Sequence, residues 1–202
     1  MLTYEKNKLK QYKLIAGCDE AGRGAWAGPL VAACVIMPKS KIIKEVNDSK
    51  KLSVKTRKKI YDQILNYAIE IQISIVEVDQ LNISNPKKES INAMSNCVKK
   101  FKKTPEIIIT DFEIINTDLP QINLIKGDQI SYNVAAASIM AKVFRDNLMV
   151  ELSHKFPNYG FEQHKGYGTI FHKKQLKKYG ITSIHRRKYK PIQKIILDNL
   201  DI

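Results

Sequence analysis

The sequence predicts one α/β domain followed by a helical extension, and three observations support this prediction. Apolar runs rich in β-branched residues alternate with segments of helical periodicity, which is typical of α/β folds. The length of 202 residues suits one domain, and 44% hydrophobic residues suffice for a core without disulfides. The segment from about residue 155 to residue 202 is basic and shows helical spacing, so it forms the extension.

Five apolar runs are predicted to form strands. The glycine-rich link between the first two runs favours a hairpin-like connection. The fourth run, "IIIT", has no polar alternation, which predicts a strand buried on both faces of a sheet. The predicted strands cover residues 12–18, 30–37, 69–78, 107–110 and 122–125.

Helical spacing of apolar residues predicts the remaining elements. Ser53 is a suitable N-cap for the first helix, and Ser131 begins a long helix whose alanines indicate close packing. The stretch "FPNYGFEQHKGYGT" is expected to be a loop, and the C-terminal "IQKIILDNLDI" an amphipathic helix or a partner-docking segment. The other predicted helices cover residues 54–68, 90–101, 131–156 and 170–179.

The charge of the chain indicates its class of partner. Lys plus Arg number 34 against 20 Asp plus Glu, which gives a formal net charge of +14. Residues 39–59 hold nine bases and two acids, and residues 161–190 hold nine bases and one acid. Two such blocks favour a nucleic acid, although a lysine-rich solvated surface is the alternative.

Other compositional features indicate the compartment. No run of apolar residues is long enough to span a membrane, and the first residues do not resemble a signal peptide, so a cytoplasmic protein is expected. Cys18, Cys34 and Cys97 are widely spaced and odd in number, which predicts reduced, buried thiols. The four histidines lack metal-binding spacing, so no zinc site of histidine and cysteine is expected.

Acidic residues follow three of the predicted strands. Asp19 and Glu20 come directly after the first, Asp111 after the fourth, and Asp128 three residues after the fifth. If these strands are parallel neighbours, all four carboxylates meet at one edge of the sheet. Carboxylates gathered in this way repel each other, and hard divalent cations remove the conflict. The sequence therefore predicts a metal site, in which two ions would clamp a phosphodiester displacement.

Two steps of this prediction are open. The link between the fourth and fifth strands is short for a parallel crossover. Adjacent residues of a regular strand point to opposite faces, so Asp19 and Glu20 share a site only if the strand breaks there, as the following Ala-Gly-Arg-Gly suggests. Asp111 has a helix cap or turn as its alternative role, and Asp128 a β-turn.

The "GRG" stretch beside the first acids suits a nucleic-acid contact. Gly22 and Gly24 let a backbone approach a sugar-phosphate closely, and Arg23 has a forked guanidinium that fits a phosphate. A hydrogen bond to the ribose 2′-hydroxyl at such a contact separates RNA from DNA. A flexible turn is the alternative interpretation.

Four further residues are candidates. Ser49 and Lys50 of "DSKKLS" are suited to phosphates, although lysine pairs on surfaces are commonly only solvated. Tyr167 lies between glycines in "HKGYGT", where it is free to stack on a sugar or base unless it is a core tyrosine. Asp146 stands four residues after Lys142 on the long helix, so we expect a structural or supporting acid that pairs with this lysine.

Five motifs give the chain a resemblance to a known family. They are "DEAGRGAWAGPLVAA", "DSKKLS", "KGDQISYNVAAASIMAKVFRD", "HKGYGT" and "HRRKYKP". In this order they resemble type 2 ribonuclease H, the bacterial ribonuclease HII, over residues 15–191.

The resemblance implies a ribonuclease H-like fold, with a mixed five-stranded sheet flanked by helices and a C-terminal helical region. It implies an endonuclease that cleaves the RNA strand of RNA–DNA hybrids and nicks DNA duplexes 5′ of embedded ribonucleotides, leaving 3′-hydroxyl and 5′-phosphate ends. Hydrolysis is expected to use two metal ions, Mg²⁺ or Mn²⁺. The carboxylates of the family map onto Asp19, Glu20, Asp111 and Asp128. Its substrate-reading elements map onto Gly22, Arg23, Gly24 and Tyr167.

Some positions depart from the pattern of the family. Ala25 and Trp26 stand where Pro-Leu is common, and Phe112 follows Asp111 where a small residue is usual. Phe112 is expected to alter packing under the site. Ribonuclease HIII carries a large N-terminal domain and lacks Gly-Arg-Gly, whereas here 18 residues precede Asp19 and the motif is intact, which favours ribonuclease HII.

Two rival hypotheses remain at this point. A non-catalytic nucleic-acid-binding module explains the basic blocks but not the acids after strands. Another ribonuclease H-fold nuclease, such as a junction resolvase, would share the carboxylates. The leading hypothesis predicts a monomer without membrane association that binds RNA–DNA hybrids and ribonucleotide-containing DNA duplexes, with weak protein docking through the C-terminal segment left open.

Overall fold

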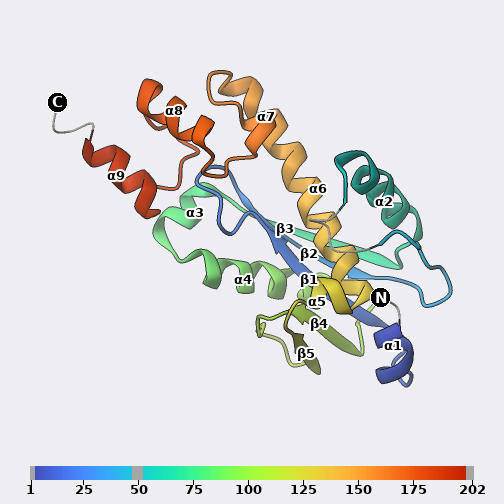
Figure 1. The fold of residues 1–202 in the computed structure, drawn as a ribbon. Coiled ribbons are helices and arrows are strands. Elements are labelled where there is room, and N and C mark those ends of the chain that lie inside the picture. Colours follow the sequence, from blue (N-terminus) through green and yellow to red (C-terminus); the bar gives the residue numbers. More distant parts are fainter. Residues whose placement is uncertain (1–2, 47–51, 199–202) are drawn as a thin grey trace.

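A mixed five-stranded sheet lies at the centre of the molecule (Figure 1). The computed structural model describes residues 3–46 and 52–198. The strand order is β3-β2-β1-β4-β5, which confirms the predicted sheet. The strands are β1 (Ile15–Ala21), β2 (Leu30–Ile36), β3 (Glu70–Val76), β4 (Ile107–Asp111) and β5 (Gln121–Leu124).

The strand directions bring the ends of β1 and β4 together. β1 and β2 form the predicted antiparallel hairpin, and β3 adds antiparallel to β2. β1 pairs parallel with β4, and β4 pairs parallel with β5, although only residues 112–120 link these last two strands. The parallel arrangement predicted for the three acid-bearing strands is therefore confirmed.

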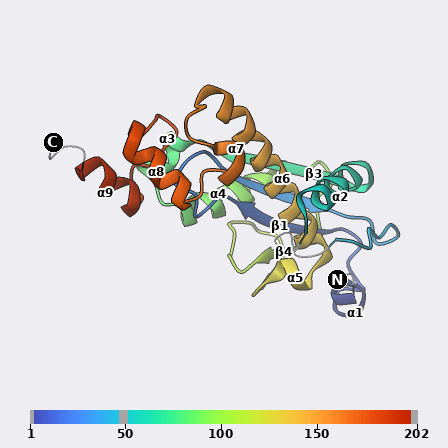
Figure 2. The same cartoon turned by 45° about the horizontal axis from the view of Figure 1, so that its top comes forward.

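Helices cover both faces of the sheet (Figures 1 and 2). Helix α6 (Tyr132–Lys155) crosses one face beside α2 (Val54–Tyr67), and α4 (Pro86–Lys99) covers the other. Ser53 and Ser131 cap α2 and α6, as predicted, by accepting a hydrogen bond from the backbone N–H three residues on. The other helices are α1 (Thr3–Lys8), α3 (Val78–Ile83), α5 (Gly127–Ile130), α7 (Phe161–His164), α8 (Ile170–Tyr179) and α9 (Lys190–Asp198). None of the described helices is long and apolar enough to cross a bilayer.

Helix α6 lies very close to β1. A Cβ atom on Gly17 would lie 2.1 Å from the carbonyl carbon of Asn133 and 2.2 Å from the nitrogen of Val134, so only glycine permits this approach. The small side chains of Ala135, Ala136 and their neighbours on α6 continue the contact into the apolar core. The close approach also brings the middle of α6 beneath the end of β1, where the acids stand.

The C-terminal extension packs on the far end of α6 (Figure 2). Phe161, Leu176 and Ile192 form its own apolar cluster, which Met149 of α6 and Ala27 join. The predicted basic helix is confirmed as α8, and the C-terminal amphipathic pattern forms α9. Helix α7 is a single turn within the stretch expected to be a loop.

Two expectations about the end of the first strand are wrong. β1 does not stop before Asp19 but continues to Ala21, because β2 supplies paired residues for both acids. Cys18 and Cys34 are not reduced thiols: the β1–β2 register places them opposite each other, 4.2 Å apart at Cα, and a disulfide joins them. Cys97 is free and buried, and burial raises the pKa of its thiol to about 12.

Candidate active site

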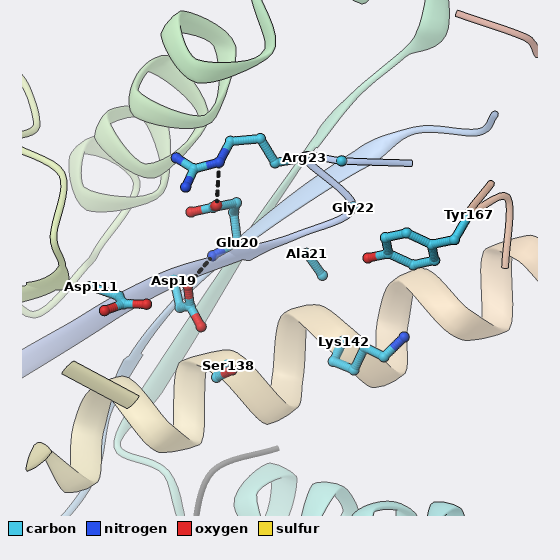
Figure 3. A pocket seen from close by; sticks show the side chains of 10 residues that line it. Asp19, Glu20, Ala21, Gly22, Arg23, Asp111, Ser138, Lys142 and Tyr167 are labelled. Atoms are coloured by element: carbon cyan, nitrogen blue, oxygen red, sulfur yellow. Dashed lines mark hydrogen bonds and ion pairs between the residues drawn. The ribbon is translucent and has the colours of Figure 1, made fainter. Parts of the chain in front are cut away.

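A cavity of about 560 Å³ opens where β1 leaves the sheet, between the loop after β1, helix α6 and the loop that carries Tyr167 (Figure 3). Ser138 and Lys142 of α6 line one side of it. The cavity brings together seven of the predicted site residues, which are Asp19, Glu20, Gly22, Arg23, Gly24, Asp111 and Tyr167.

Asp19 and Glu20 share this cavity although the strand does not break between them. The β1–β4 ladder ends at the pair Cys18 and Thr110, whereas β1 runs on to Ala21 beside β2 alone. The last part of β1 therefore has an open edge on the β4 side. Asp19 points toward α6 and Glu20 toward the opposite face, and both reach the open edge (Figure 3).

The pKa of Asp19 is strongly raised. Only 7% of Asp19 is exposed, and burial is the main cause that raises its pKa well above the ordinary value. The negative charges of Glu20 and Asp111 raise this pKa further, while a hydrogen bond with Ser138 opposes the shift. Burial and the neighbouring carboxylates therefore both disfavour the charged form of Asp19.

Asp111 is anchored by the start of α5. Its Oδ1 accepts a hydrogen bond from the backbone N–H of Gly127 at 2.8 Å, which fixes the carboxylate at the end of β4. Asp128 follows Gly127 and is 3% exposed within α5, and it is not among the residues that line the cavity. The structure thus brings three of the four predicted carboxylates to one cavity and places the fourth next to the backbone that anchors Asp111.

The donors at this cavity suit a hard divalent cation. Three carboxylates offer oxygen atoms of the kind that such a cation binds, and a cation held there would relieve the repulsion that raises the pKa of Asp19. Within residues 3–46 and 52–198, no three His, Cys, Asp or Glu side chains already stand close enough to enclose a metal ion. The carboxylates fit such an ion in kind and number, and they would draw together on binding it.

Arg23 is held at the rim by two acids. Its Nε lies 3.3 Å from Glu20 Oε1, and its Nη1 donates to Glu113 Oε1 at 2.7 Å. Burial alone would lower the pKa of Arg23, but Glu20 and Glu113 outweigh it and raise the pKa. Glu113, which is 5% exposed, also lies 3.3 Å from Nζ of Lys87. Arg23 is therefore charged and held in place by the two acids, and 42% of its side chain remains exposed.

Two buried arginines lie beneath the Gly22–Gly24 loop, and Arg186 holds it by hydrogen bonds. Nη1 of Arg186 donates to the carbonyl of Gly22 at 2.7 Å, and its other nitrogens donate to the carbonyls of Gly28 and Pro29. Arg145 donates to Pro29 at 2.8 Å as well, and to the carbonyls of Ala27 and Lys165. Both arginines are fully buried, and none of the described carboxylates forms a salt bridge with them.

The buried Arg145 side chain also explains why position 22 is glycine. Its φ is +91°, a left-handed conformation that side chains disfavour, and a Cβ there would lie 2.0 Å from Nε of Arg145. At Gly24 a Cβ would meet no atom within 4 Å, so packing in the fold does not require glycine at that position. Burial lowers the pKa of Arg145 to about 10, so it remains charged at neutral pH and adds positive potential beneath the loop.

Tyr167 faces the cavity from the loop after α7, with its hydroxyl directed inward (Figure 3). The guanidinium carbon of Arg145 lies 5.3 Å from its ring centroid and Nζ of Lys142 lies 5.6 Å from it, so cations contact the ring. Lys142 also donates to Asp146 at 2.7 Å, which confirms the predicted pair. Trp26 joins this loop to the loop after β1, because the backbone N–H of Trp26 donates to the carbonyl of Gly166 at 2.8 Å.

Two buried histidines fix the backbone of the same loop. Nδ1 of His172 lies 3.0 Å from the carbonyl oxygen of Tyr167, which only accepts, so this nitrogen carries the hydrogen. The N–H of Thr182 donates to Nδ1 of His185 at 2.8 Å, so His185 donates through Nε2 to Nε2 of His172 at 3.1 Å. Both rings are neutral in this chain of hydrogen bonds. Burial is the main cause that lowers the pKa of His172 to about 4 and that of His185 to about 3.

Phe112 does not pack under the site, contrary to expectation. It is 58% exposed and has a φ of +68°. A left-handed conformation costs a residue other than glycine roughly 1–2 kcal/mol. Ala25 and Trp26, the other departure from the family pattern, are accommodated: Ala25 is fully buried, and Trp26 lies against Gly168 and 5.9 Å from the ring of His172.

The remaining predicted residues have different outcomes. Ser49 and Lys50 lie outside the described residues. The residues that the sequence analysis did not select are those that position the predicted ones, namely Glu113, Ser138, Arg145, His172, His185 and Arg186. Arg186 belongs to "HRRKYKP", one of the five motifs of the resemblance, and nothing local distinguishes a buried arginine from its exposed neighbour Arg187.

Comparison with known proteins identifies the family. The ribonuclease HII family model matches residues 16–192. Two proteins named ribonuclease HII, from Acetivibrio thermocellus and from a Sulfurihydrogenibium species, are each 47% identical to the chain over 191 and 189 residues. Each of these matches covers 92% of this chain, and they cover 73% and 94% of the two relatives.

Solved structures share the fold. The ribonuclease H2 of Pyrococcus horikoshii has a TM-score of 0.81 at 23% identity and covers 94% of this chain and 100% of its own. The ribonuclease HII of Archaeoglobus fulgidus, solved in complex with PCNA, has a TM-score of 0.76 at 28% identity, with 88% and 95% covered. A Bst ribonuclease HIII solved with Mn²⁺ has a TM-score of 0.70 at 19% identity, with 94% and 71% covered. The ribonuclease H-like fold is thus confirmed. The chain therefore belongs to the ribonuclease HII family of divalent-metal-dependent endonucleases, which act on nucleic acids.

Proposed function

We propose that this endonuclease cleaves the RNA strand of RNA–DNA hybrids and nicks DNA duplexes on the 5′ side of embedded ribonucleotides. The products would carry 3′-hydroxyl and 5′-phosphate ends. One observation carries this proposal: a single cavity joins the carboxylates Asp19, Glu20 and Asp111 to the Gly22–Gly24 loop and Tyr167. Cutting chemistry and sugar recognition thus face the same nucleotide.

Each side of the cavity has its own task in this proposal. Asp19, Glu20 and Asp111 hold Mg²⁺ or Mn²⁺, with Asp128 as the fourth predicted ligand if α5 shifts toward the cavity. Bound divalent ions supply Lewis acidity and neutralise the charge that develops on the phosphate during hydrolysis. A pair of ions is the arrangement that suits an in-line displacement.

The loops recognise the substrate. The backbone of Gly22 and Gly24 approaches the sugar, where a hydrogen bond to the 2′-hydroxyl distinguishes ribose from deoxyribose. Tyr167 packs on the adjacent sugar or base, and Arg23 contacts a phosphate in exchange for one of its two acids. Asp146 does not contact the substrate itself; it holds Lys142 beside the ring of Tyr167.

Replacement of the most buried carboxylate tests the catalytic proposal. Asp19→Asn keeps the shape of the side chain and removes the charge, so it relieves repulsion with Glu20 and Asp111 and leaves the fold intact. We expect cleavage of a duplex with one ribonucleotide to fall by at least about 100-fold with either metal, while duplex affinity changes little.

The matched control is Asp79→Asn, because Asp79 is an exposed acid on α3 away from the cavity. It should cleave at the wild-type rate. Full activity in Asp19→Asn would contradict the assignment of the carboxylates. A wild-type protein that cuts four-way junctions in preference to ribonucleotide-containing duplexes would favour a resolvase, and one that binds both without cutting would favour a binding module.

The setting of the protein is a further part of the proposal. We infer a monomeric cytoplasmic enzyme formed by one domain over residues 1–202, with the region from residue 155 as its basic substrate-binding extension. Helix α9 is amphipathic, with Ile192 buried against the extension and Leu197 60% exposed. An archaeal ribonuclease HII was solved in complex with PCNA, which supports weak protein docking, and we place that docking at the exposed apolar side of α9.

A further inference from the structure

Phe112 stands in a strained backbone conformation and is largely exposed. Its φ is +68°, and 58% of the residue is exposed. The N–H of Glu113 donates to the carbonyl of Asp111 at 2.8 Å, so Phe112 is the middle residue of a three-residue turn with positive φ. This form of the turn is rare and strained, and glycine would adopt it at less cost.

The turn itself serves the active site, but the phenyl ring contributes nothing to it. The turn lets Asp111 face Gly127 and directs the buried Glu113 toward Arg23. Glycine in place of Phe112 would build the same turn with less strain. A bulky residue that is both strained and exposed beside a carboxylate of the active site indicates a task outside the fold.

The surroundings of the ring show what it suits. Phe112 lines a hollow of about 470 Å³ together with Lys87, Glu113, Ile114 and other side chains. Nζ of Lys87 lies 5.9 Å from the ring centroid, and 59% of the Lys87 side chain is exposed. An apolar ring next to the exposed ammonium of Lys87 suits a sugar with its phosphate, which is the repeating unit of a nucleic-acid strand.

Glu113 stands between this hollow and the active-site cavity: its Oε1 accepts from Arg23 at the rim of the cavity, and its Oε2 lies 3.3 Å from Lys87 in the hollow. Phe112 also follows Asp111 directly in the chain. A strand bound across the carboxylates and Arg23 reaches the ring within one or two nucleotides.

We propose that Phe112 and Lys87 form a subsite for one sugar-phosphate unit of the bound duplex, beside the nucleotide at the carboxylates. The ring packs on the apolar face of the sugar, and the ammonium of Lys87 leaves Glu113 to contact the phosphate. The proposal rests on the proposed function, because its occupant is the duplex substrate.

Three variants of Phe112 separate the ring from the strain. The probe is a fluorescein-labelled DNA duplex with one ribonucleotide, and anisotropy in EDTA measures its affinity without cleavage. Phe112→Ala removes the ring and keeps the strain, Phe112→Gly removes both, and Phe112→Trp keeps an aromatic ring. We expect about tenfold weaker binding in the first two and nearly wild-type binding in the third. The melting temperature should nevertheless be higher in Phe112→Gly than in Phe112→Ala.

Lys87 has a test of its own. Lys87→Ala should weaken binding and reduce the slope of log affinity against log salt by about one, as the loss of a single phosphate contact predicts. The neighbouring exposed Lys88 is the matched control, and Lys88→Ala should leave the slope near the wild-type value. Ile83→Ala controls for the loss of exposed apolar surface, since Ile83 is 73% exposed on α3.

The outcomes distinguish the subsite from the function on which it rests. Wild-type affinity in both Phe112→Ala and Phe112→Gly overturns the subsite alone. Weaker binding in Phe112→Ala that Phe112→Gly restores also overturns it, because the backbone and not the ring would then be responsible. A wild-type protein that neither binds nor cuts the duplex overturns the proposed function first.

Discussion

The two halves of the active-site cavity are built by different means. The acidic half stands on the sheet: Asp19 and Glu20 belong to β1, and Asp111 ends the parallel neighbour β4. The other half consists of the Gly22–Gly24 loop and Tyr167, which we propose read the sugar, and this reading half stands on two loops outside the sheet. Its positions depend on buried polar side chains that come from α6 and from the C-terminal extension.

The difference concerns where the stabilising contacts originate. Backbone hydrogen bonds within the sheet hold the acids, because β1 pairs with β2, 14 residues on at Asp19 and Ala33, and with β4, 92 residues on at Cys18 and Thr110. The carbonyl of Gly22 is instead held by Arg186, 164 residues further along the chain. The acidic half should therefore tolerate damage to the C-terminal extension, whereas the reading half should not.

Removal of Arg186 is expected to have the largest effect on this comparison. Arg186→Met keeps much of the volume but removes the charged donor to the buried carbonyls of Gly22, Gly28 and Pro29. Each lost hydrogen bond to a charged donor is worth about 1.5–3 kcal/mol, so the free energy of unfolding should fall by about 3 kcal/mol or more. Incision at a single ribonucleotide should fall by over about 100-fold, because the loop that reads the sugar is released.

The neighbouring residue provides the control for this variant. Arg187 is exposed, so Arg187→Met removes the same charge without emptying a buried site. Chemical denaturation and single-turnover cleavage should both remain near wild type in this control. If Arg186→Met lost no more activity than Arg187→Met, the hydrogen bonds from Arg186 to the loop would have no functional role in the reading half.

The same difference decides how much of the site the sequence predicts. The acids after apolar runs, the hairpin and the parallel strands could be inferred, because strand ends and periodicity are local patterns. The missing break after Asp19 could not, because β2 and not the local sequence decides where β1 ends. Glu113 and Arg186 were missed for a related reason: burial of a charged side chain depends on carbonyls and acids that folding brings from distant parts of the chain.

A smaller effect is expected from substitution of His172, which holds the backbone of the loop that carries Tyr167. The side-chain amide of Asn reaches about the position of Nδ1, and that of Gln about the position of Nε2. His172→Asn should therefore keep the donor to the carbonyl of Tyr167, whereas His172→Gln should lose it. Loss of one such hydrogen bond is worth about 1 kcal/mol, so incision should fall roughly five- to tenfold in His172→Gln only.

A double-mutant cycle shows whether His172 acts through Tyr167. In a Tyr167→Ala background the loop no longer presents a ring, so His172→Gln should cause little further loss of incision. Additive losses would mean that the histidine stabilises the extension in general and does not position the tyrosine. In the single Tyr167→Ala variant, incision should fall more than duplex affinity.

The mildest perturbation is low pH, which should destabilise the reading half before the acidic half. Burial lowers the pKa of His172 to about 4 and that of His185 to about 3, whereas an unfolded chain protonates histidine near pH 6.5. Between these values the unfolded state binds more protons than the folded state, so stability is full above about pH 7 and falls as the pH decreases toward about 4. At pH 5.5 the two histidines together should cost about 3 kcal/mol.

Trp26, the single tryptophan, lies 5.9 Å from His172 and reports on this region by fluorescence. At pH 5.5 its thermal transition should precede the loss of far-ultraviolet circular dichroism, while at pH 8 the two should coincide. The exposed His154 gives the control, since His154→Gln should leave both transitions unchanged. Coincident transitions at both pH values would show that the two halves of the cavity unfold as one unit, and that the histidines do not make the loops the weaker half.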